Sequence, residues 1–147
     1  GADVEFFDML VADVNGTVKA GENSYKWNTW ADVLNPKKGT EVLATYEDQF
    51  YKGNAAATTR KLGKGTVTYV GVESNDGDFE RQIVRTIYSR ANVAIEDLPK
   101  GVFIEWRDGF YVGVNYTSEP INLPIPKGSK IVVGQNPLQP AQAVIWK

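Results

Sequence analysis

The stretch that most constrains the fold runs from Glu41 to Val72 and reads EVLATYEDQFYKGNAAATTRKLGKGTVTYVGV. Valine, threonine and tyrosine, which favour strands, are dense on both sides of a short glycine turn. The LGKG of Leu62–Gly65 predicts a tight hairpin, because two glycines beside Lys64 can supply positive φ. A phosphate-binding loop would lead into a helix, and this one leads into a strand, so we expect Lys64 to be a solvated turn residue.

The overall composition excludes several classes of protein. The chain has 147 residues, 42% of them hydrophobic and 23% charged, which suits one ordinary domain or two small ones. The net charge is −2 with no basic face, so we expect no nucleic-acid partner. No apolar run approaches the roughly 20 residues of a membrane span, and we expect neither a membrane partner nor a secretory leader.

Two residue types are missing. Without Cys there is no disulfide, thiol nucleophile or thiolate metal site. Without His there is no Ser-His-Asp or Cys-His catalysis, no imidazole base and no histidine metal site. Carboxylates, Lys, Tyr, Ser and Thr remain for chemistry. The sequence therefore indicates a support or binding unit, and it predicts no metal and no other cofactor.

The region before this block has weaker signals. Residues 4–7 suggest a first strand, and the NGT of residues 15–17 a turn into a second. For Trp27–Pro36 we expect one helical turn, because Thr29 and Asp32 precede apolar residues and a proline ends the segment.

One helix is predicted after the block, over Asp78–Ala91. Its apolar residues recur at helical spacing: Phe79, Ile83, Val84, Ile87, Tyr88 and Ala91. Asp78 is the expected N-cap, with acidic residues in the first turn and basic residues near the end. We expect this stripe to pack against a mixed sheet.

The pattern changes at Glu96–Gly101, where proline and glycine interrupt the chain and the period becomes 2. Beyond it we expect five short strands in a small antiparallel sandwich or barrel-like unit. The first two are joined by a turn at Asp108 and Gly109, and the third covers residues 121–125. Trp106 and Trp146 are expected to pack its core.

Three stretches in order resemble the carboxyl-terminal part of glycoside hydrolase family 42 β-galactosidases. They are the segment from Trp27 through GKGTVTYVG, the segment LPKGVFIEWRDGFYVGVNYTSEP, and the closing IVVGQNPLQPAQAVIWK. Members of that family have a barrel with two catalytic glutamates, an α/β trimerisation domain and a small β-domain. The resemblance implies that residues 1–97 are the end of the second part and residues 98–147 the third.

This resemblance implies a β-rich α+β fold: a partial, amidotransferase-like α/β sheet with one main helix, then a small antiparallel β-sandwich. It implies a non-catalytic scaffold fragment of a bacterial, cytoplasmic enzyme. The expected partners are the parent's catalytic barrel and further copies of the chain.

Carboxylates are the candidates for catalytic residues, because retaining glycoside hydrolysis needs two of them about 5–5.5 Å apart. The adjacent or nearby pairs are Glu47 and Asp48, Glu96 and Asp97, and Glu105 and Asp108. We expect all of them to be solvated surface groups. No catalytic residue carries over from the family.

The alternative function is a carbohydrate-binding, lectin-like module, because tryptophans can form a platform for sugar rings. Trp27 and Trp30 are the candidates, either as sugar contacts or as interface residues. Asn15 and Asn115 each begin an Asn-x-Thr sequon, which we interpret as chance.

Overall fold

The computed structural model describes all residues, 1–147, and divides the chain into two compact units, Gly1–Ile95 and Glu96–Lys147. We call them unit 1 and unit 2 and describe each by itself. The helix α1 (Asp78–Arg90) has 13 residues, and no helix of this chain is a candidate for a membrane span.

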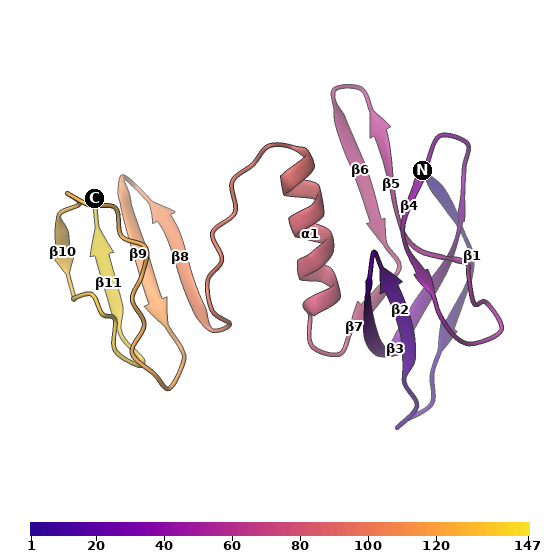
Figure 1. Cartoon of the computed structure of the whole chain (residues 1–147), viewed down its shortest axis with the longest axis horizontal. Coiled ribbons are helices and arrows are strands. Elements are labelled where there is room, and N and C mark those ends of the chain that lie inside the picture. The colour runs from indigo at the N-terminus through magenta and orange to yellow at the C-terminus, as the bar shows by residue number, and fades with distance from the viewer. The chain divides into compact units, whose positions relative to one another are not determined.

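Unit 1 is a seven-stranded sheet with one helix (Figure 1). Its elements are β1 (Ala2–Met9), β2 (Gly16–Ala20), β3 (Asn23–Pro36), β4 (Glu41–Tyr46), β5 (Ala55–Leu62), β6 (Gly65–Val70), β7 (Val72–Ser74) and α1 (Asp78–Arg90). The strand order is β1-β3-β2-β4-β5-β6, with β7 paired to β3. Every strand pair is antiparallel, so the mixed sheet expected from the sequence is wrong. These pairings do not decide the amidotransferase-like relationship, which stays a prediction.

The long strand β3 organises this sheet, and it corrects the helical turn predicted at Trp27–Pro36. It pairs with β1 and β2, and also with β5 and β7. Since β2 pairs with β4 and β4 with β5, the single β5–β3 bridge at Leu34 and Ala55 closes a ring of four strands. Along β3, Trp27, Ala31 and Val33 are buried, which is the period of a strand. Neighbouring strands supply backbone partners, and these outweigh the weak local helix signals.

The predicted hairpin of β5 and β6 is confirmed. Its register runs from Ala57 opposite Val70 to Leu62 opposite Gly65. Only the first of the two turn glycines, Gly63, has positive φ, at 59°. The first five residues of β5 are small and buried, which allows this strand to lie inside the unit.

The helix α1 is confirmed, but its start differs from the prediction. The N-cap is Gly77 in the left-handed region with φ 77°, and Asp78 is the first helical residue. Ser74 and Glu80 hold the turn before it, since the Ser74 N–H and hydroxyl donate to Glu80 at 2.6 and 2.7 Å. The Ser74 hydroxyl in turn accepts from the Phe79 N–H at 3.3 Å. Side-chain oxygens therefore cap the helix from outside it.

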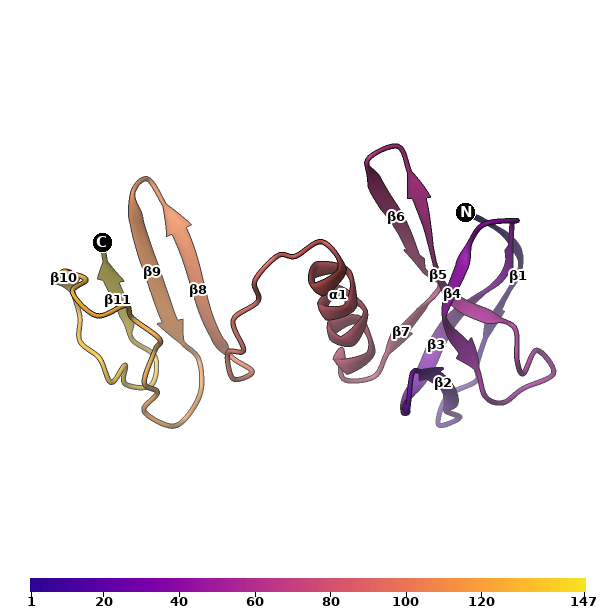
Figure 2. The same cartoon turned by 45° about the horizontal axis from the view of Figure 1, so that its top comes forward.

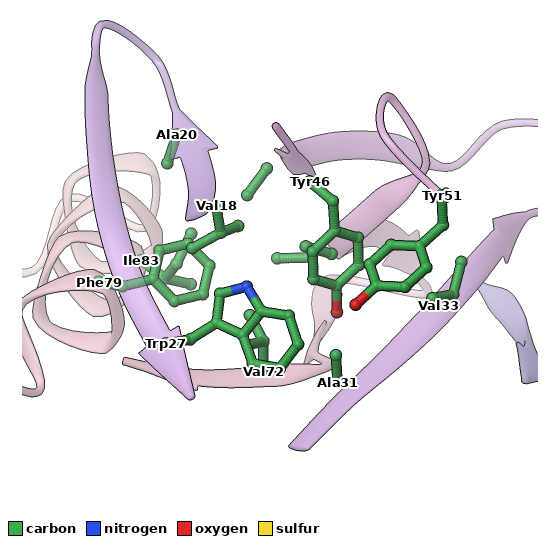
Figure 3. Close-up of a cluster of buried hydrophobic side chains, with 13 residues drawn as sticks. Val18, Ala20, Trp27, Ala31, Val33, Tyr46, Tyr51, Val72, Phe79 and Ile83 are labelled. Atoms are coloured by element: carbon green, nitrogen blue, oxygen red, sulfur yellow. The ribbon is translucent and has the colours of Figure 1, made fainter. Parts of the chain in front are cut away.

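The core of unit 1 is rich in aromatic rings (Figure 3). Trp27 lies between Phe79 of the helix and Tyr46 of β4, and it meets the Tyr46 ring edge-on at 5.9 Å. Tyr46 and Tyr51 are themselves edge-to-face at 4.9 Å. Phe79 and Ile83 are the buried residues of α1, whereas Val84 and Tyr88 stay about half exposed. The helix therefore contributes a narrower stripe than its sequence predicts.

Unit 2 is one four-stranded antiparallel sheet of order β10-β11-β9-β8 (Figure 2). Its strands are β8 (Val102–Arg107), β9 (Phe110–Asn115), β10 (Ile131–Val133) and β11 (Ala143–Trp146). The predicted turn at Asp108 and Gly109 is confirmed, with φ of 48° and 88°. The strand expected at residues 121–125 is instead a single bridge, Ile121 to Leu138. Unit 2 therefore has one sheet covered by loops, and the expected two-sheet sandwich is wrong.

Candidate functional site

Unit 1 carries an exposed aromatic surface on β1 and β3. The Phe7 and Trp30 rings stack with centroids 4.5 Å apart and planes 8° apart. The register places Met9 opposite Trp30 and Phe7 opposite Asp32, so these side chains share one face of the sheet. Phe7 and Met9 are each 60% exposed and Trp30 is 41% exposed. We call Phe7, Met9 and Trp30 the aromatic surface.

Asp32 anchors this surface to the rest of the unit. Its carboxylate accepts hydrogen bonds from Trp30 Nε1 at 2.8 Å and from the Tyr69 hydroxyl at 2.6 Å. The hydrogen bond to Asp32 is the main reason that the pKa of Tyr69 is raised. The buried Tyr46 hydroxyl donates to the Asp32 carbonyl at 3.0 Å. Trp30 is therefore held in place on both its ring face and its ring nitrogen.

Close backbone contact fixes Asp32 itself. Its N–H donates to the Gly71 carbonyl at 2.7 Å, and the Gly71 N–H donates to the Ala56 carbonyl at 2.8 Å. A Cβ at Gly71 would lie 2.6 Å from the Asp32 carbonyl oxygen. Only glycine fits at this junction of β3, β5 and the β6–β7 strand without a shift.

A second aromatic group surrounds Phe50, which is 83% exposed. Its ring stacks on Phe6 at 5.4 Å and contacts Tyr51 edge-on at 4.9 Å. The Tyr51 hydroxyl donates to the Asp8 carboxylate at 2.7 Å. Burial, followed by this hydrogen bond, raises the pKa of Tyr51, so the phenol stays protonated and acts as the donor.

The two tryptophans singled out in the sequence lie in different surroundings. Trp30 is exposed on the aromatic surface, whereas Trp27 is fully buried in the core. A Cβ at Gly16 would lie 2.4 Å from the Trp27 indole, so the ring fills the space that this glycine leaves. Trp27 Nε1 is buried without a hydrogen-bond partner. Trp27 is therefore a core residue and not an interface or sugar contact.

The other two tryptophans, Trp106 and Trp146, also lie in different surroundings. Trp146 is buried and stacks on Tyr111 at 5.5 Å, as expected for the core of unit 2. Trp106 is 60% exposed, so its expected core role is wrong. Both tryptophans belong to strands of one sheet, and strand alternation alone does not say which face is covered.

The candidate catalytic carboxylates belong to both units: Glu47 and Asp48 lie in unit 1, and the other two pairs lie in unit 2. Glu47 accepts a hydrogen bond from the Ser24 hydroxyl at 2.6 Å, and Asp48 has one buried oxygen without a partner. Glu105 and Asp108 are exposed on and after β8. No group of three or more acidic side chains is arranged to hold a metal ion.

Sequence reasoning identifies Trp30 but misses Phe7 and Phe50. Phe7 alternates with Phe6, and a pair of adjacent phenylalanines on a strand places one ring outward whatever the register. This pair of phenylalanines is the sequence pattern from which an exposed ring on this strand could have been predicted. Trp30 donates to Asp32, and Asp32 also accepts a hydrogen bond from Tyr69. Asp32 and Tyr69 are 37 positions apart, so no local pattern in the sequence predicts that second bond.

Known proteins resemble this chain closely enough to place it. A profile described as the β-galactosidase trimerisation domain matches residues 1–94. The β-galactosidase BgaH of Haloferax lucentense is 30% identical over 137 residues, covering 92% of this chain and 20% of that protein. The β-galactosidase Pbg of Clostridium perfringens is 31% identical over 118 residues, which is 76% of this chain and 16% of that one.

Solved structures of β-galactosidases have a similar fold over the whole of this chain. The β-galactosidase of the Antarctic haloarchaeon Halorubrum lacusprofundi superimposes with a TM-score of 0.83 at 27% identity, covering 100% of this chain and 22% of that one. Gan42B, a family 42 β-galactosidase of G. stearothermophilus, shares the fold with a TM-score of 0.81 at 22% identity, covering 99% and 23%. The chain thus spans about a fifth of its relatives' length. It belongs to the β-galactosidase trimerisation domain family and corresponds to a part of the glycoside hydrolase family 42 enzymes.

Proposed function

We propose that this chain is a non-catalytic assembly module of a β-galactosidase-like glycoside hydrolase. Unit 1 associates with further copies and so holds catalytic barrels, supplied by the rest of the parent protein, in register. The observation that carries the proposal is the exposed aromatic surface within the residues that match a trimerisation domain.

The geometry of the aromatic surface suits a protein contact. Large exposed rings bury much area on association, and a ring that is already fixed loses little entropy. Trp30 meets both conditions, because Phe7 covers one face and Asp32 accepts from its nitrogen. Such rigid aromatic anchors dominate the binding energy of many interfaces.

Light scattering coupled to size-exclusion chromatography tests the assembly. We expect the whole chain to associate as its concentration rises, toward a trimer. Phe7→Ser should weaken this association, because it removes the outer ring of the stack. Phe103→Ser is the matched control, a phenylalanine of unit 2 with 53% exposure. A monomer at every concentration would refute the proposal for this chain.

An activity assay tests the non-catalytic part of the proposal. The purified chain, incubated with a chromogenic β-galactoside, should show no turnover above background. Steady turnover that disappears when one Asp or Glu of this chain is replaced would contradict the assignment of catalysis to the barrel.

Carbohydrate binding is the second candidate, and the exposure of Trp30 is the observation that favours it. Two contacts weigh against it: Phe7 occupies one ring face, and Trp30 and Tyr69 already engage both oxygens of Asp32. Titration with galactose and lactose, followed by tryptophan fluorescence, should give no saturable change. Saturable binding abolished by Trp30→Ala but kept in Trp106→Ala would make this the better function.

Two finer points belong to the same proposal. The parent's second domain is expected to have an amidotransferase-like α/β sheet, which a structure of a longer protein would test. The parent is expected to be bacterial and cytoplasmic, which cell fractionation would test. The bacterial relative from Clostridium perfringens supports a bacterial parent.

A further inference from the structure

A hollow of about 230 Å³ lies within unit 1, between the tip of the β5–β6 hairpin and the C-terminal half of α1 (Figures 1 and 2). Its apolar part is formed by Leu43 of β4 and by Ile87 and Ala91 at the end of the helix. Lys61 and Lys64 of the hairpin also line it. The hollow therefore joins an apolar wall to a basic one.

The basic wall carries charge that nothing in the chain compensates. Three of the lining residues are cations, Lys61, Lys64 and Arg90, and none is acidic. Arg90 donates to both oxygens of Glu41, so its charge is already paired. Lys61 and Lys64 are exposed and form no ion pair within the chain. Two ammonium groups are therefore free to bind an anion at this hollow.

The size and lining of the hollow define the kind of molecule that it suits. An apolar cavity of about 150 Å³ can hold benzene, so this hollow has room for one such ring and a small charged group. A carboxylate would accept charge-assisted hydrogen bonds from the lysines. The ring would remove the apolar wall from water. An inorganic anion or a neutral apolar molecule would use only one of the two walls.

We infer that this hollow binds a small carboxylate with an apolar body, about the size of benzoate. The ring lies against Leu43 and Ile87, and the carboxylate lies between Lys61 and Lys64. This site goes beyond the proposed assembly role and does not depend on it. The dissociation constant is expected to be about 1 mM, because exposed charge pairs contribute little and only one ring is buried.

Titration of the whole chain with four small probes, followed by NMR of its backbone amides, tests the site. Benzoate should give saturable shifts at the hairpin tip and at the end of α1. Benzyl alcohol lacks the charge and acetate lacks the ring, so each should bind at least about 10-fold more weakly. Benzylamine carries the opposite charge and should not bind. Added salt should weaken the binding of benzoate.

Variants of the lining residues test each wall separately. Lys61→Gln together with Lys64→Gln should weaken benzoate binding about 10-fold, because both exposed attractions are lost. Ala91→Leu should weaken it as well, because the larger side chain fills the hollow. Arg60→Gln is the matched control: it removes an exposed cation of the same hairpin that does not line the hollow, and it should leave the affinity nearly unchanged. Circular dichroism confirms that each variant folds.

Three results would overturn the inference. The first is the absence of saturable benzoate shifts at these residues, and the second is equal affinity for benzoate and benzyl alcohol. The third is a double lysine variant that binds benzoate unchanged but unfolds at a lower temperature. In that case the lysines serve the negative end of the helix dipole and not a ligand. Each of these results would leave the proposed assembly role standing.

Discussion

Unit 1 and unit 2 both bury apolar side chains against a sheet, but different structures cover the two sheets. Unit 1 closes four strands into a ring around a large aromatic core, to which β2, β3, β4, β7 and α1 all contribute. Unit 2 has one small sheet and only five buried apolar residues: Val102, Leu123, Leu138, Val144 and Trp146. Its second layer is irregular chain, which cannot satisfy its own backbone groups as a strand does.

Side-chain amides replace the missing strand partners in unit 2. Asn115 is fully buried, and its Nδ2 donates to the Glu119 and Leu138 carbonyls at 2.8 and 3.0 Å. Its Oδ1 accepts from the Thr117 N–H and hydroxyl at 2.8 and 2.7 Å. Asn136 exchanges two hydrogen bonds with the Leu123 backbone, at 2.9 and 3.1 Å, much as a strand residue would. A small core is therefore compatible with order when polar side chains hold the covering loop.

The largest predicted change in stability comes from removing the buried indole of Trp27 at the centre of unit 1. Trp27→Ala should lower the free energy of unfolding of unit 1 by about 3–5 kcal/mol, because a fully buried indole leaves a cavity. Urea unfolding followed by circular dichroism, with hydrogen exchange resolved by peptide, measures it for each unit. The exposed Trp106→Ala is the control, with an effect below about 0.5 kcal/mol. Equal effects would mean that Trp27 is not central to the ring.

The corresponding change in unit 2 removes hydrogen bonds rather than apolar volume. Asn115→Ala should destabilise unit 2 by about 2–4 kcal/mol, because buried donors and acceptors of the loop lose their partner. Hydrogen exchange should accelerate in residues 116–142 and stay unchanged in unit 1. Lys127→Ala, on the surface of the same unit, is the control. An effect below about 1 kcal/mol would show that apolar packing alone holds the loop.

Substitutions at Gly71 and Gly65 test how closely the strands of unit 1 pack where β3 and β5 meet. Gly71→Ala should cost about 1–3 kcal/mol in unit 1, because the new Cβ meets backbone that cannot give way easily. Gly65→Ala is the matched control, since a Cβ added there would have nothing within 4 Å and the φ of Gly65 is not positive. Thermal unfolding compares the two. Equal midpoints would mean that the junction at Asp32 is looser than its contacts indicate.

The smallest effect concerns the exposed ion pair that joins α1 to β4. Arg90 donates to both oxygens of Glu41 at 2.7 and 2.8 Å, and this hydrogen bonding holds the pKa of Glu41 below its ordinary 4.5. A lowered folded pKa means that the stabilisation is complete above 4.5 and is lost as the pH falls through the folded value. Both side chains are about half exposed, so we expect less than about 1 kcal/mol.

Comparing Arg90→Ala with the unaltered chain across this pH range measures that contribution. The stability difference should be constant near neutral pH, shrink in acid below the ordinary pKa of Glu41, and decrease with added salt. A difference that persists in strong acid would assign the effect to packing of the Arg90 stem.

How far the fold could be predicted depended on how local each signal was. The β5–β6 hairpin, the turn at Asp108 and the helix α1 were predicted because turn glycines and helical spacing are read over a few residues. Trp27–Pro36 was misassigned, because its strand is held by four different partner strands. Of the candidate site, the sequence identified Trp30 but neither its partners nor the burial of Trp27.

By itself the sequence determined the family, the β-rich composition and the positions of the tight turns, since these depend on residue types in order along the chain. Only the tertiary structure decided that Trp27 is buried, that Trp30 is exposed beside Phe7, and that Asn115 takes the place of a strand partner. The physical reason is that exposure and pairing are properties of contacts between distant segments. A strand has the same alternation whether its edge is paired or free, so that choice is made when the chain closes on itself.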